Sequence, residues 1–552
     1  MKDTWHARRF NFLLSVVVLI FFVLIVRILY LNVFDKHFLQ HQSYIRSVRL
    51  EKIPAHRGMI LDRNQVPLAI SSAVESIWVN LRILTATHSQ LWHLAKLLHL
   101  PYASILHKAK DRSRWFVYLK RRVNPELADE IKNLDISGIF FEREFQRFYP
   151  DAEVTSHVLG FTNIDDKGQE GLELAYNSWL EGETGLRRVL KDRLGHVIAN
   201  LETIKRPIAG HNLILSLDAR IQYLAFQVLK KTVKKYHAAS GSIVVLNCHT
   251  GEVLAMVNQP AFNPNDKKNA DESSYRNRAV TDQFEPGSTM KAFSIISALD
   301  SGKYTPDTKI DTNPGWMVVG GNTINDEHVN HGVITVTQVL QKSSNVGAAK
   351  MTLSLPPEQL WNLLYRFGFG ERTTSGFPGE ASGSLVDHRV WRPFVLATLA
   401  FGYGVSATTL QLARAYAIIA NDGKKVPITF LKLNKTPDST AVITPKVAHE
   451  MLHMLTSVVK AGGTGGKARL SNYTVAGKTG TAYIASPKGG YDKHKYIGSF
   501  VGIAPVSNPQ LVVAVVIREP KGQHFGGLVA APAFAKVMGG ALRFLNVIPD
   551  KM

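Results

Sequence analysis

The chain has 552 residues, 45% of them hydrophobic, so it is long enough for several packed domains. An excess of 65 Lys and Arg over 44 Asp and Glu gives a formal net charge of +21, which indicates an anionic partner or surface. Nucleic acid is excluded as that partner, because no basic helix, zinc finger or aromatic-basic motif is present. An anionic membrane surface or an anionic precursor fits the charge better, with a solvated basic surface as the alternative.

Cysteine and histidine usage argues against a metal site. Cys248 is the only cysteine, so an intrachain disulfide is excluded, and we expect a small buried or edge residue of a strand. The 20 His include no His-Glu-x-x-His and no Cys-His zinc spacing. His37 and His41 share a helical face, but two ligands do not make a metal site. We predict no metal and no cofactor.

The N-terminus carries one predicted membrane span. Residues 10–26 are apolar apart from two small polar side chains, and a span needs about 17–25 residues. A cleaved signal peptide is the alternative, but its apolar region is shorter and ends in small residues, which are missing here. We predict an uncleaved signal-anchor over residues 10–34. Basic residues before it place residues 1–9 in the cytoplasm and the rest of the chain outside.

Residues 35–205 form a predicted mixed region without catalytic spacing. A strand, a turn and a strand are expected over Glu51–Ser71, with turns at Arg57-Gly58 and Asp62-Arg63-Asn64. A later group of acids can be imagined as a metal or acid–base site, but we prefer interdomain salt bridges and turns for Asp165, Asp166, Glu170 and Glu173.

Residues 206–552 have the pattern of an α+β domain. Leu213–Leu217 is expected to be a short strand, and Asp218 to cap a helix that ends near Tyr236. A helical block separates an early alternating hairpin from three late strands, with predicted bounds Gly241–Leu246, Val253–Val257, Tyr473–Tyr483, Tyr496–Ile503 and Leu511–Ile517. We predict an antiparallel sheet of about five strands, built from both ends of the domain and covered by helices.

Ser288-Thr289-Met290-Lys291 is the candidate catalytic turn. Pro286-Gly287 breaks the chain in front of it, and the apolar run behind it predicts a buried helix that stops at Gly302. Residues three apart on a helix are neighbours, with about 5–6 Å between Cβ atoms, so a neutral Lys291 can take the Ser288 proton. The helix N-terminus favours a developing oxyanion at this point.

Two further motifs follow the serine in order. Ser343-Ser344-Asn345 lies between two helical stretches, and Lys478-Thr479-Gly480 is the only Lys-Thr-Gly of the chain. Ser457-Val458-Val459-Lys460 repeats the first spacing, but no chain break precedes it, so we interpret Ser457 and Lys460 as ordinary helix residues. The glycine-rich Ala461–Ala468 lacks the first Gly and the Ser or Thr of a phosphate loop.

The order Ser-x-x-Lys, Ser-x-Asn, Lys-Thr-Gly resembles the signature of the penicillin-recognising serine acyltransferases. Over nearly its whole length the chain resembles class B penicillin-binding proteins, and it looks most like their septal, cell-division member. The other matching stretches are Arg57-Gly58, Asp62-Arg63-Asn64, Tyr149-Pro150, His157–Glu173, Phe401–Gly423, Gly502–Pro505, Gly526-Gly527 and Val529–Pro532. The resemblance implies the penicillin-binding transpeptidase fold, with an elongated pedestal over residues 35–205 and the transpeptidase domain over 206–552.

By that resemblance the chain would be a serine-type peptidoglycan D,D-transpeptidase. Ser288 would attack the penultimate D-Ala carbonyl of a stem pentapeptide, and an amine of a neighbouring stem would take the acyl group. Lys291 would be the base, Ser343 would relay the proton to the leaving group, and Asn345 would orient Lys291 and hold a substrate amide.

The third motif would bind substrate. Lys478 and Thr479 would hold the terminal carboxylate, with Gly480 and Thr481 completing the substrate-binding strand. The backbone N–H groups of Ser288 and Thr481 would form the oxyanion hole. β-Lactams, which mimic D-Ala-D-Ala, should acylate Ser288. We expect a long-lived adduct, because nothing matches the glutamate base of class A β-lactamases.

A second amine explains how Lys291 can act as a base. A free lysine has a pKa near 10.4 and would be charged. A Lys478 ammonium about 4 Å away, at an effective dielectric of about 20, contributes roughly 4 kcal/mol of repulsion, or about three pKa units. Desolvation acts in the same direction.

Several alternatives stay open. An elongation-type paralogue or a D,D-carboxypeptidase would share the site chemistry. A divisome scaffold would not need the catalytic residues together, and a β-lactam sensor would need a signalling domain across the membrane. The resemblance further implies stem pentapeptides, β-lactams, a glycan polymerase and other division proteins as partners, in the bacterial inner membrane with a periplasmic catalytic domain.

Overall fold

The computed structural model describes residues 2–110, 115–192, 197–267, 271–326, 329–486 and 489–551. This part of the chain divides into two compact units, each discontinuous in sequence. The first contains residues 1–56, 73–145 and 182–209, and the second contains residues 57–72, 146–181 and 210–552. The boundary expected at residues 205 and 206 stays a prediction.

The first unit begins with α1 (Lys2–Val33), followed by α2 (Lys36–Ser47). Within the described residues, α1 is the one helix long and apolar enough to cross a membrane, over Ala7–Val33. The span predicted over residues 10–34 lies within this helix except for Phe34, which follows its last residue.

The remainder of the first unit contains two small sheet regions. One is a sheet of β1 (Val48–Ile53), β6 (Gly185–Lys191) and β7 (Val197–Lys205). The other elements are β4 (Val117–Val123), α3 (His88–Leu98), α4 (Tyr102–Lys110) and α5 (Pro125–Lys132), together with parts of β3 (Pro67–Val79) and β5 (Ile139–Phe148). The expected strand–turn–strand over residues 51–71 is only partly right. β2 (Ile60–Leu61) and β3 form the hairpin, whereas β1 pairs with β6 instead.

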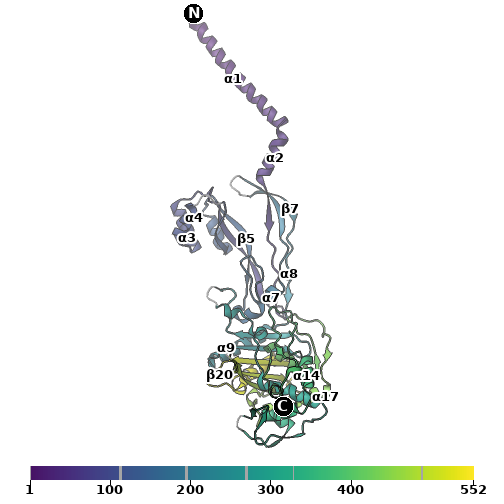
Figure 1. The fold of residues 1–552 in the computed structure, drawn as a ribbon. Helices are drawn as coiled ribbons and strands as arrows, with labels where there is room; N and C mark the ends of the chain where they lie inside the picture. The colour runs from purple at the N-terminus through teal and green to yellow at the C-terminus, as the bar shows by residue number, and fades with distance from the viewer. Residues whose placement is uncertain are drawn as a thin grey trace. The chain divides into compact units, whose positions relative to one another are not determined.

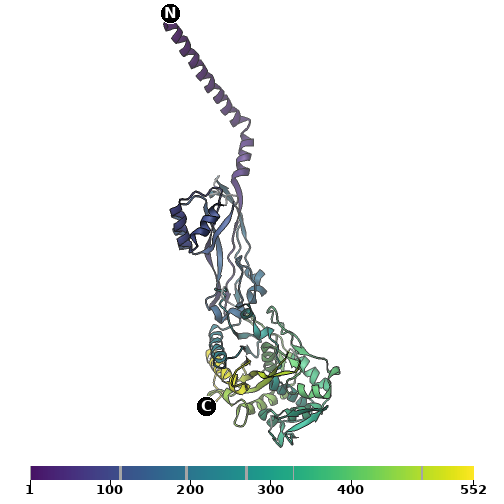
Figure 2. The ribbon, with the colours of Figure 1, turned by 60° about the vertical axis from the view of Figure 1, so that its left-hand side comes forward.

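The second unit is built on an antiparallel sheet in the order β10-β9-β21-β20-β19, five strands within the described residues. Figures 1 and 2 show the late, yellow strands beside the earlier teal strands in one sheet. The bounds are β9 Ser240–Asn247, β10 Val253–Gln259, β19 Ala476–Ala485, β20 Tyr491–Ala504 and β21 Leu511–Arg518. The predicted sheet, assembled from both ends of the domain, is confirmed.

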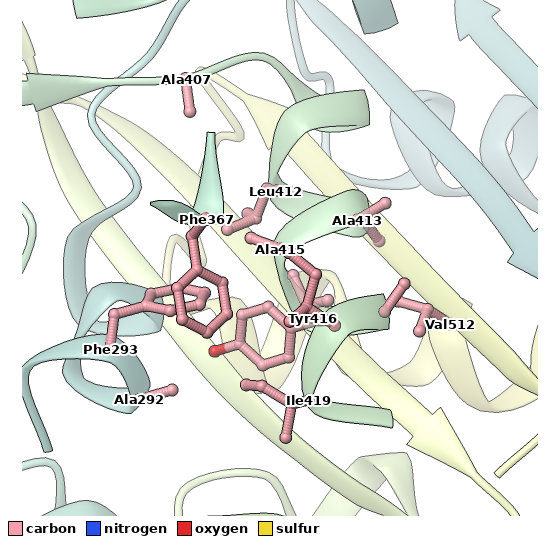
Figure 3. Close-up of a cluster of buried hydrophobic side chains, with 14 of the residues drawn as sticks. Ala292, Phe293, Phe367, Ala407, Leu412, Ala413, Ala415, Tyr416, Ile419 and Val512 are labelled. Atoms are coloured by element: carbon pink, nitrogen blue, oxygen red, sulfur yellow. The ribbon is translucent and has the colours of Figure 1, made fainter. Parts of the chain in front are cut away.

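Helices cover both faces of this sheet. α9 (Ala219–Lys235) and α19 (Ala531–Phe544) pack on one face, in a core with Val513 and Val515 of β21. α11 (Lys291–Asp300), α16 (Thr409–Ala420) and α17 (Pro445–Val459) share the other core, with Val512 and Ala514. Alternate residues of β21 therefore enter different cores, as the two-residue period of a strand requires. Figure 3 shows part of the second core, where the Tyr416 ring of α16 lies beside Phe293 of α11.

One expectation about this sheet is wrong, because helices cover both of its faces. The hairpin β9–β10 was expected to alternate, but all seven residues of β10 are buried and β9 is buried up to Leu246. Cys248, just beyond β9, is fully buried and its thiol donates to the carbonyl of Pro509 at 3.2 Å. Burial raises the pKa of this thiol to about 12, so it is an inert packing residue.

The other elements of the second unit are short or carry the loops around the sheet. They are α6 Ser156–Leu159, α7 Gly171–Ala175, α8 Asn177–Leu180, β8 Leu213–Ile214, α10 Arg278–Thr281, β11 Lys309–Asp311, β12 Trp316–Val319, β13 Asn322–Asn325, β14 Val333–Thr335, α12 Val336–Lys342, α13 Asn345–Leu353, α14 Pro357–Phe367, β15 Ser384–Leu385, α15 Pro393–Leu399, β16 Val405–Ser406, β17 Lys424–Lys425, β18 Thr440–Ala441 and α18 Gly526–Val529.

The expected charge pairing among the early acids centres on one residue. Glu173 has no exposed side-chain surface and accepts from Arg57 Nε at 2.8 Å and from Arg147 Nε at 2.6 Å. Both arginines are also buried. Asp166 contributes its backbone carbonyl, which accepts from Arg57 at 3.1 Å. The interpretation as salt bridges is confirmed for Glu173. The expectation that they are interdomain is wrong, because Arg57, Arg147 and Glu173 all lie within the second unit.

Candidate active site

The nucleophile candidate lies on a tight turn that leads into a buried helix. Gly287–Met290 is a 3₁₀ turn and α11 begins at Lys291, so Ser288 precedes the α-helix rather than opening it. The tighter turn still aligns residues three apart. Lys291 Nζ lies 3.1 Å from Ser288 Oγ. Tyr416 of α16 supports the turn, because its hydroxyl donates to the Thr289 carbonyl at 2.8 Å.

Lys291 is fully buried among oxygen atoms. Its Nζ lies 2.5 Å from the backbone carbonyl of Ser343 and 2.7 Å from Asn345 Oδ1. A third contact, to Ser343 Oγ, is 3.1 Å. The first and second predicted motifs are thus in direct contact at this amine.

Lys478 reaches the same point from β19, the edge strand of the sheet. It is fully buried, and its Nζ donates to Ser343 Oγ at 2.9 Å. The Ser343 hydroxyl therefore lies between two lysine amines. The structure brings together Ser288, Lys291, Ser343, Asn345 and Lys478.

The second motif is held in place by an aspartate that the sequence analysis missed. Ser343 ends α12 in the left-handed conformation, φ 62° and ψ 39°, and Ser344 caps α13 by accepting from the Gly347 amide. Asp326 Oδ1 accepts the backbone N–H of Asn345 at 2.5 Å, and its Oδ2 accepts the Ser344 hydroxyl at 2.6 Å. Nothing in the local sequence around Asp326 signals this role, because its partners are about 20 residues away.

The third motif runs beside the nucleophile turn. A Cβ on Gly480 would overlap Ser499 Oγ and lie 2.8 Å from the Pro286 carbonyl, so only glycine allows this approach. Thr479 Oγ1 is 2.7 Å from Thr464 Oγ1, which brings the glycine-rich loop to the same strand. Thr481 is partly exposed and its Oγ1 accepts from the Gly526 amide at 3.2 Å. The predicted substrate-binding residues therefore lie on one strand that borders the serine turn.

The alternative Ser-x-x-Lys match is far less organised. Ser457 is near the end of α17 and its hydroxyl donates to the Met454 carbonyl at 2.7 Å. Lys460 was expected to be a helix residue, which is wrong, because it is the extended C-cap residue of that helix.

A separate cavity of about 610 Å³ lies in the second unit, lined by residues such as His157, Glu170, Arg276 and Phe377. None of the predicted site residues lines it.

Comparison with protein families matches both parts of the chain. Residues 241–539 match the family described as the penicillin binding protein transpeptidase domain, and residues 52–215 match the penicillin-binding protein dimerisation domain. The match to the first family alone covers more than half of the chain and contains all three motifs.

Curated relatives match over nearly the full length. The chain is 42% identical over 551 residues to the probable peptidoglycan D,D-transpeptidase PbpC of Pseudomonas aeruginosa, covering 99% of this chain and 97% of that protein. It is 40% identical over 548 residues to the probable peptidoglycan D,D-transpeptidase PenA of Neisseria meningitidis, with coverages of 98% and 94%. It is 39% identical over 552 residues to peptidoglycan D,D-transpeptidase FtsI of Escherichia coli K12, with coverages of 99% and 93%.

Solved structures agree with this fold. Penicillin-binding protein 3 of Mycobacterium tuberculosis, complexed with aztreonam, is 28% identical with a TM-score of 0.71, covering 90% of this chain and 98% of that one. The transpeptidase domain of Burkholderia pseudomallei penicillin-binding protein 3 is 44% identical with a TM-score of 0.57, covering 61% of this chain and 98% of that one.

Proposed function

Because the chain belongs to the class B penicillin-binding proteins, we propose that it is a peptidoglycan D,D-transpeptidase of septal cell-wall synthesis that acts through a Ser288 acyl-enzyme. The observation that carries the proposal is the placement of two buried amines on one serine hydroxyl, with the nucleophile candidate beside one of them.

The contacts of Lys291 support its role as the base. A neutral amine has two N–H donors and one lone pair. The two shortest contacts, to the Ser343 carbonyl and Asn345 Oδ1, take the donors. The lone pair can then accept the proton of the Ser288 hydroxyl across the 3.1 Å contact. The Lys478 ammonium on the other side of Ser343 favours this neutral form by charge repulsion.

In the acylation step, one bond forms, one bond breaks and one proton is transferred to the leaving group. Ser288 Oγ bonds to the penultimate D-Ala carbonyl carbon, and its proton passes to Lys291. The C–N bond to the terminal D-Ala breaks, and the leaving nitrogen receives a proton through the Ser343 hydroxyl. The backbone N–H groups of Ser288 and Thr481 stabilise the oxyanion, at about 3 kcal/mol per donor.

Deacylation uses the same groups in reverse. A neutral amine of a second stem attacks the acyl carbon and loses a proton, while Ser288 Oγ leaves and recovers one. The third motif holds the substrate in both steps. Its terminal carboxylate is bound by Lys478 and Thr479, and the peptide lies along the strand that continues through Gly480 and Thr481. A β-lactam enters the first half of this cycle and stays on Ser288.

Labelling with fluorescent penicillin tests the nucleophile. Ser288→Ala should abolish covalent labelling, and Lys291→Met should reduce it strongly. Ser457→Ala is the matched control, because Ser457 has the same spacing to a lysine, and this variant should label like the parent. Labelling of Ser288→Ala at the parent level would overturn the assignment.

Depletion in cells tests the septal role. A division enzyme gives filaments on depletion, whereas an elongation-type paralogue gives round cells. Purified protein with a D-Ala-D-Ala peptide separates transpeptidase from D,D-carboxypeptidase, because the first transfers the acyl group to an added amine and the second to water. A scaffold or a sensor would transfer the acyl group neither to the amine nor to water.

Membrane topology and partners complete the proposal. The apolar helix over Ala7–Val33 supports a single-pass anchor. We propose a cytoplasmic N-terminus and a periplasmic catalytic domain, since the basic residues of the sequence precede the apolar run. A C-terminal alkaline phosphatase fusion should therefore be active. A glycan polymerase and other division proteins are the proposed partners, to be tested by co-purification from membranes.

A further inference from the structure

The cavity of about 610 Å³ in the second unit lies outside the reaction centre. Its volume is within the range of about 300–1,000 Å³ that small-ligand sites occupy. Residues between 156 and 174, residues between 272 and 281, and the loop 377–379 line it, so three distant parts of the chain meet there. None of the residues proposed for catalysis is among them. The cavity is therefore a separate candidate site.

Two carboxylates line this cavity without partners. The side chains of Glu170 and Glu272 make no hydrogen bond and no ion pair within the described part of the chain. Both residues are exposed, so a ligand that enters the cavity can reach them. Burial raises the pKa of Glu170, and no neighbouring positive charge lowers it. The cavity thus holds anionic groups that lack a counter-ion.

His157 adds a nearly buried acceptor to the wall. Only 6% of its surface is exposed, and it lines the cavity. Its Nε2 lies 2.8 Å from the Ser274 carbonyl, and because a carbonyl can only accept, Nε2 carries the proton. Nδ1 therefore carries the lone pair, retains accessible surface and has no hydrogen-bond partner among the described residues. Burial lowers the pKa of His157 to about 4, so the ring is a neutral acceptor at neutral pH.

The arginine of the wall is already paired. Arg276 Nε lies 2.7 Å from Asp282 Oδ1 and donates to Thr281 Oγ1 at 2.9 Å. The two carboxylates and the free Nδ1 are all acceptors, so they select a ligand with N–H donors and a positive charge. A chain with a formal net charge of +21 thus presents an anionic cavity, which attracts cations that the rest of the surface repels.

The remaining lining suits an apolar stem. It includes Leu174, which is 43% exposed, together with Phe377, Pro378 and the ring of Tyr275. Aromatic rings also attract an ammonium group. The part of the chain that the structure describes holds no group of three His, Cys, Asp or Glu side chains that could bind a metal ion. The acceptors are therefore spaced for a larger, organic cation.

We propose that this cavity binds an organic cation with an apolar stem. The carboxylates of Glu170 and Glu272 supply its counter-charge, and His157 Nδ1 accepts from a further N–H group of the ligand. The cation can be a free alkyl amine or the lysine side chain of a peptide. Both sources share one chemistry, and the two arms of the test separate them.

Each arm compares a cation with a neutral compound of similar shape. The small-molecule arm uses 1,5-diaminopentane against 1,5-pentanediol. The peptide arm uses acetyl-lysyl-phenylalanine amide against acetyl-norleucyl-phenylalanine amide. Ligand-observed NMR titration of the full chain in detergent gives the Kd of each compound. No turnover is involved, so failure of the proposed transpeptidase activity would leave this measurement unaffected.

The parent should bind the cation about tenfold more tightly than the neutral compound in at least one arm, and the arm that responds identifies the source. Glu170→Gln should weaken binding of the cation and leave the neutral compound unchanged. The double variant with Glu170→Gln and Glu272→Gln should bring the ratio close to one. Glu358→Gln, an exposed acid of α14 outside the cavity, is the matched control and should keep the parent ratio.

Two further variants locate the bound cation. Ser288→Ala should bind it like the parent, because the cavity is separate from the reaction centre. Loss of binding in Ser288→Ala would place the cation at the reaction centre and overturn the inference. Equal binding of both compounds by the parent in both arms would also overturn it, as would a parent ratio in the double variant. Circular dichroism verifies that the double variant is folded.

Discussion

Asp326 holds Asn345 by its backbone, with 2.5 Å between the Asp326 Oδ1 and the Asn345 amide nitrogen. The same carboxylate accepts the Val346 amide at 2.9 Å and, through its second oxygen, the Ser344 hydroxyl. One buried acid thus sets the start of α13, from which Asn345 Oδ1 reaches Lys291 at 2.7 Å. Asp326 therefore positions Asn345, and through it the proposed base Lys291.

Removing that acid should slow acylation without removing the nucleophile. We expect Asp326→Ala to lower the second-order rate of penicillin acylation by up to about 100-fold, since displacement of a catalytic group by about 1 Å costs that much. Stopped-flow measurement with a fluorescent penicillin, together with circular dichroism to verify folding, checks this. A folded variant that acylates at the parent rate would show that Asn345 needs no such support.

Gly480→Ala should separate the substrate strand from the serine turn. The added Cβ would overlap Ser499 Oγ and press on the Pro286 carbonyl, so β19 must move away. We expect a loss of at least about tenfold in acylation rate. Gly466→Ala is the matched control, because its Cβ would meet nothing within 4 Å. Equal rates for both variants would contradict the close approach.

Glu173→Gln should strongly destabilise the second unit. The change leaves Arg57 and Arg147 buried without a counter-charge, and breaking a buried ion pair costs about 3–5 kcal/mol. Chemical denaturation measures the loss in free energy of unfolding. Glu183→Gln, which breaks an exposed pair with Lys205, should change it little. A stable Glu173→Gln protein would show that the arginines find other partners.

His157 should make stability fall on mild acidification. Burial lowers its pKa from 6.5 to about 4, with a further lowering by Arg278 and an opposing hydrogen bond to the Ser274 carbonyl. Between these values the unfolded chain takes up the proton and the folded chain does not. The stability is therefore complete above pH 6.5 and falls by about 3 kcal/mol as pH drops to about 4.

Unfolding curves between pH 7 and 4 test this slope. His157→Gln should flatten it, whereas the exposed His453→Gln should not. If both variants keep the parent slope, other groups carry the acid sensitivity.

Glu285→Gln should stabilise the protein at neutral pH. The folded pKa of Glu285 is raised above its ordinary 4.5 by burial, so the unfolded chain loses this proton first as pH rises. Stability is then lost through that window, and the neutral glutamine escapes the loss. The melting temperature of the variant should exceed that of the parent at pH 7 and match it below pH 4.5. A less stable variant at pH 7 would mean that the charge has a structural partner.

Local patterns predicted the parts of this protein that depend on neighbours in sequence. The i, i+3 spacing put Ser288 beside Lys291, the apolar run marked α1, and alternating or continuous apolar stretches marked the strands of the sheet. The resemblance added Ser343, Asn345 and Lys478, which a single sequence cannot bring together by spacing.

The tertiary structure decided what depends on contacts between distant segments. Four features have no local signature: the Asp326 support of α13, the burial of β10 on both faces, the pairing of β1 with β6, and a Glu285 Oε2 without a hydrogen-bond partner among the described residues. Each arises because folding brings together backbone groups and charges that lie far apart along the chain. Sequence alone thus predicted the reacting groups, and only folding determined which residues hold them in place.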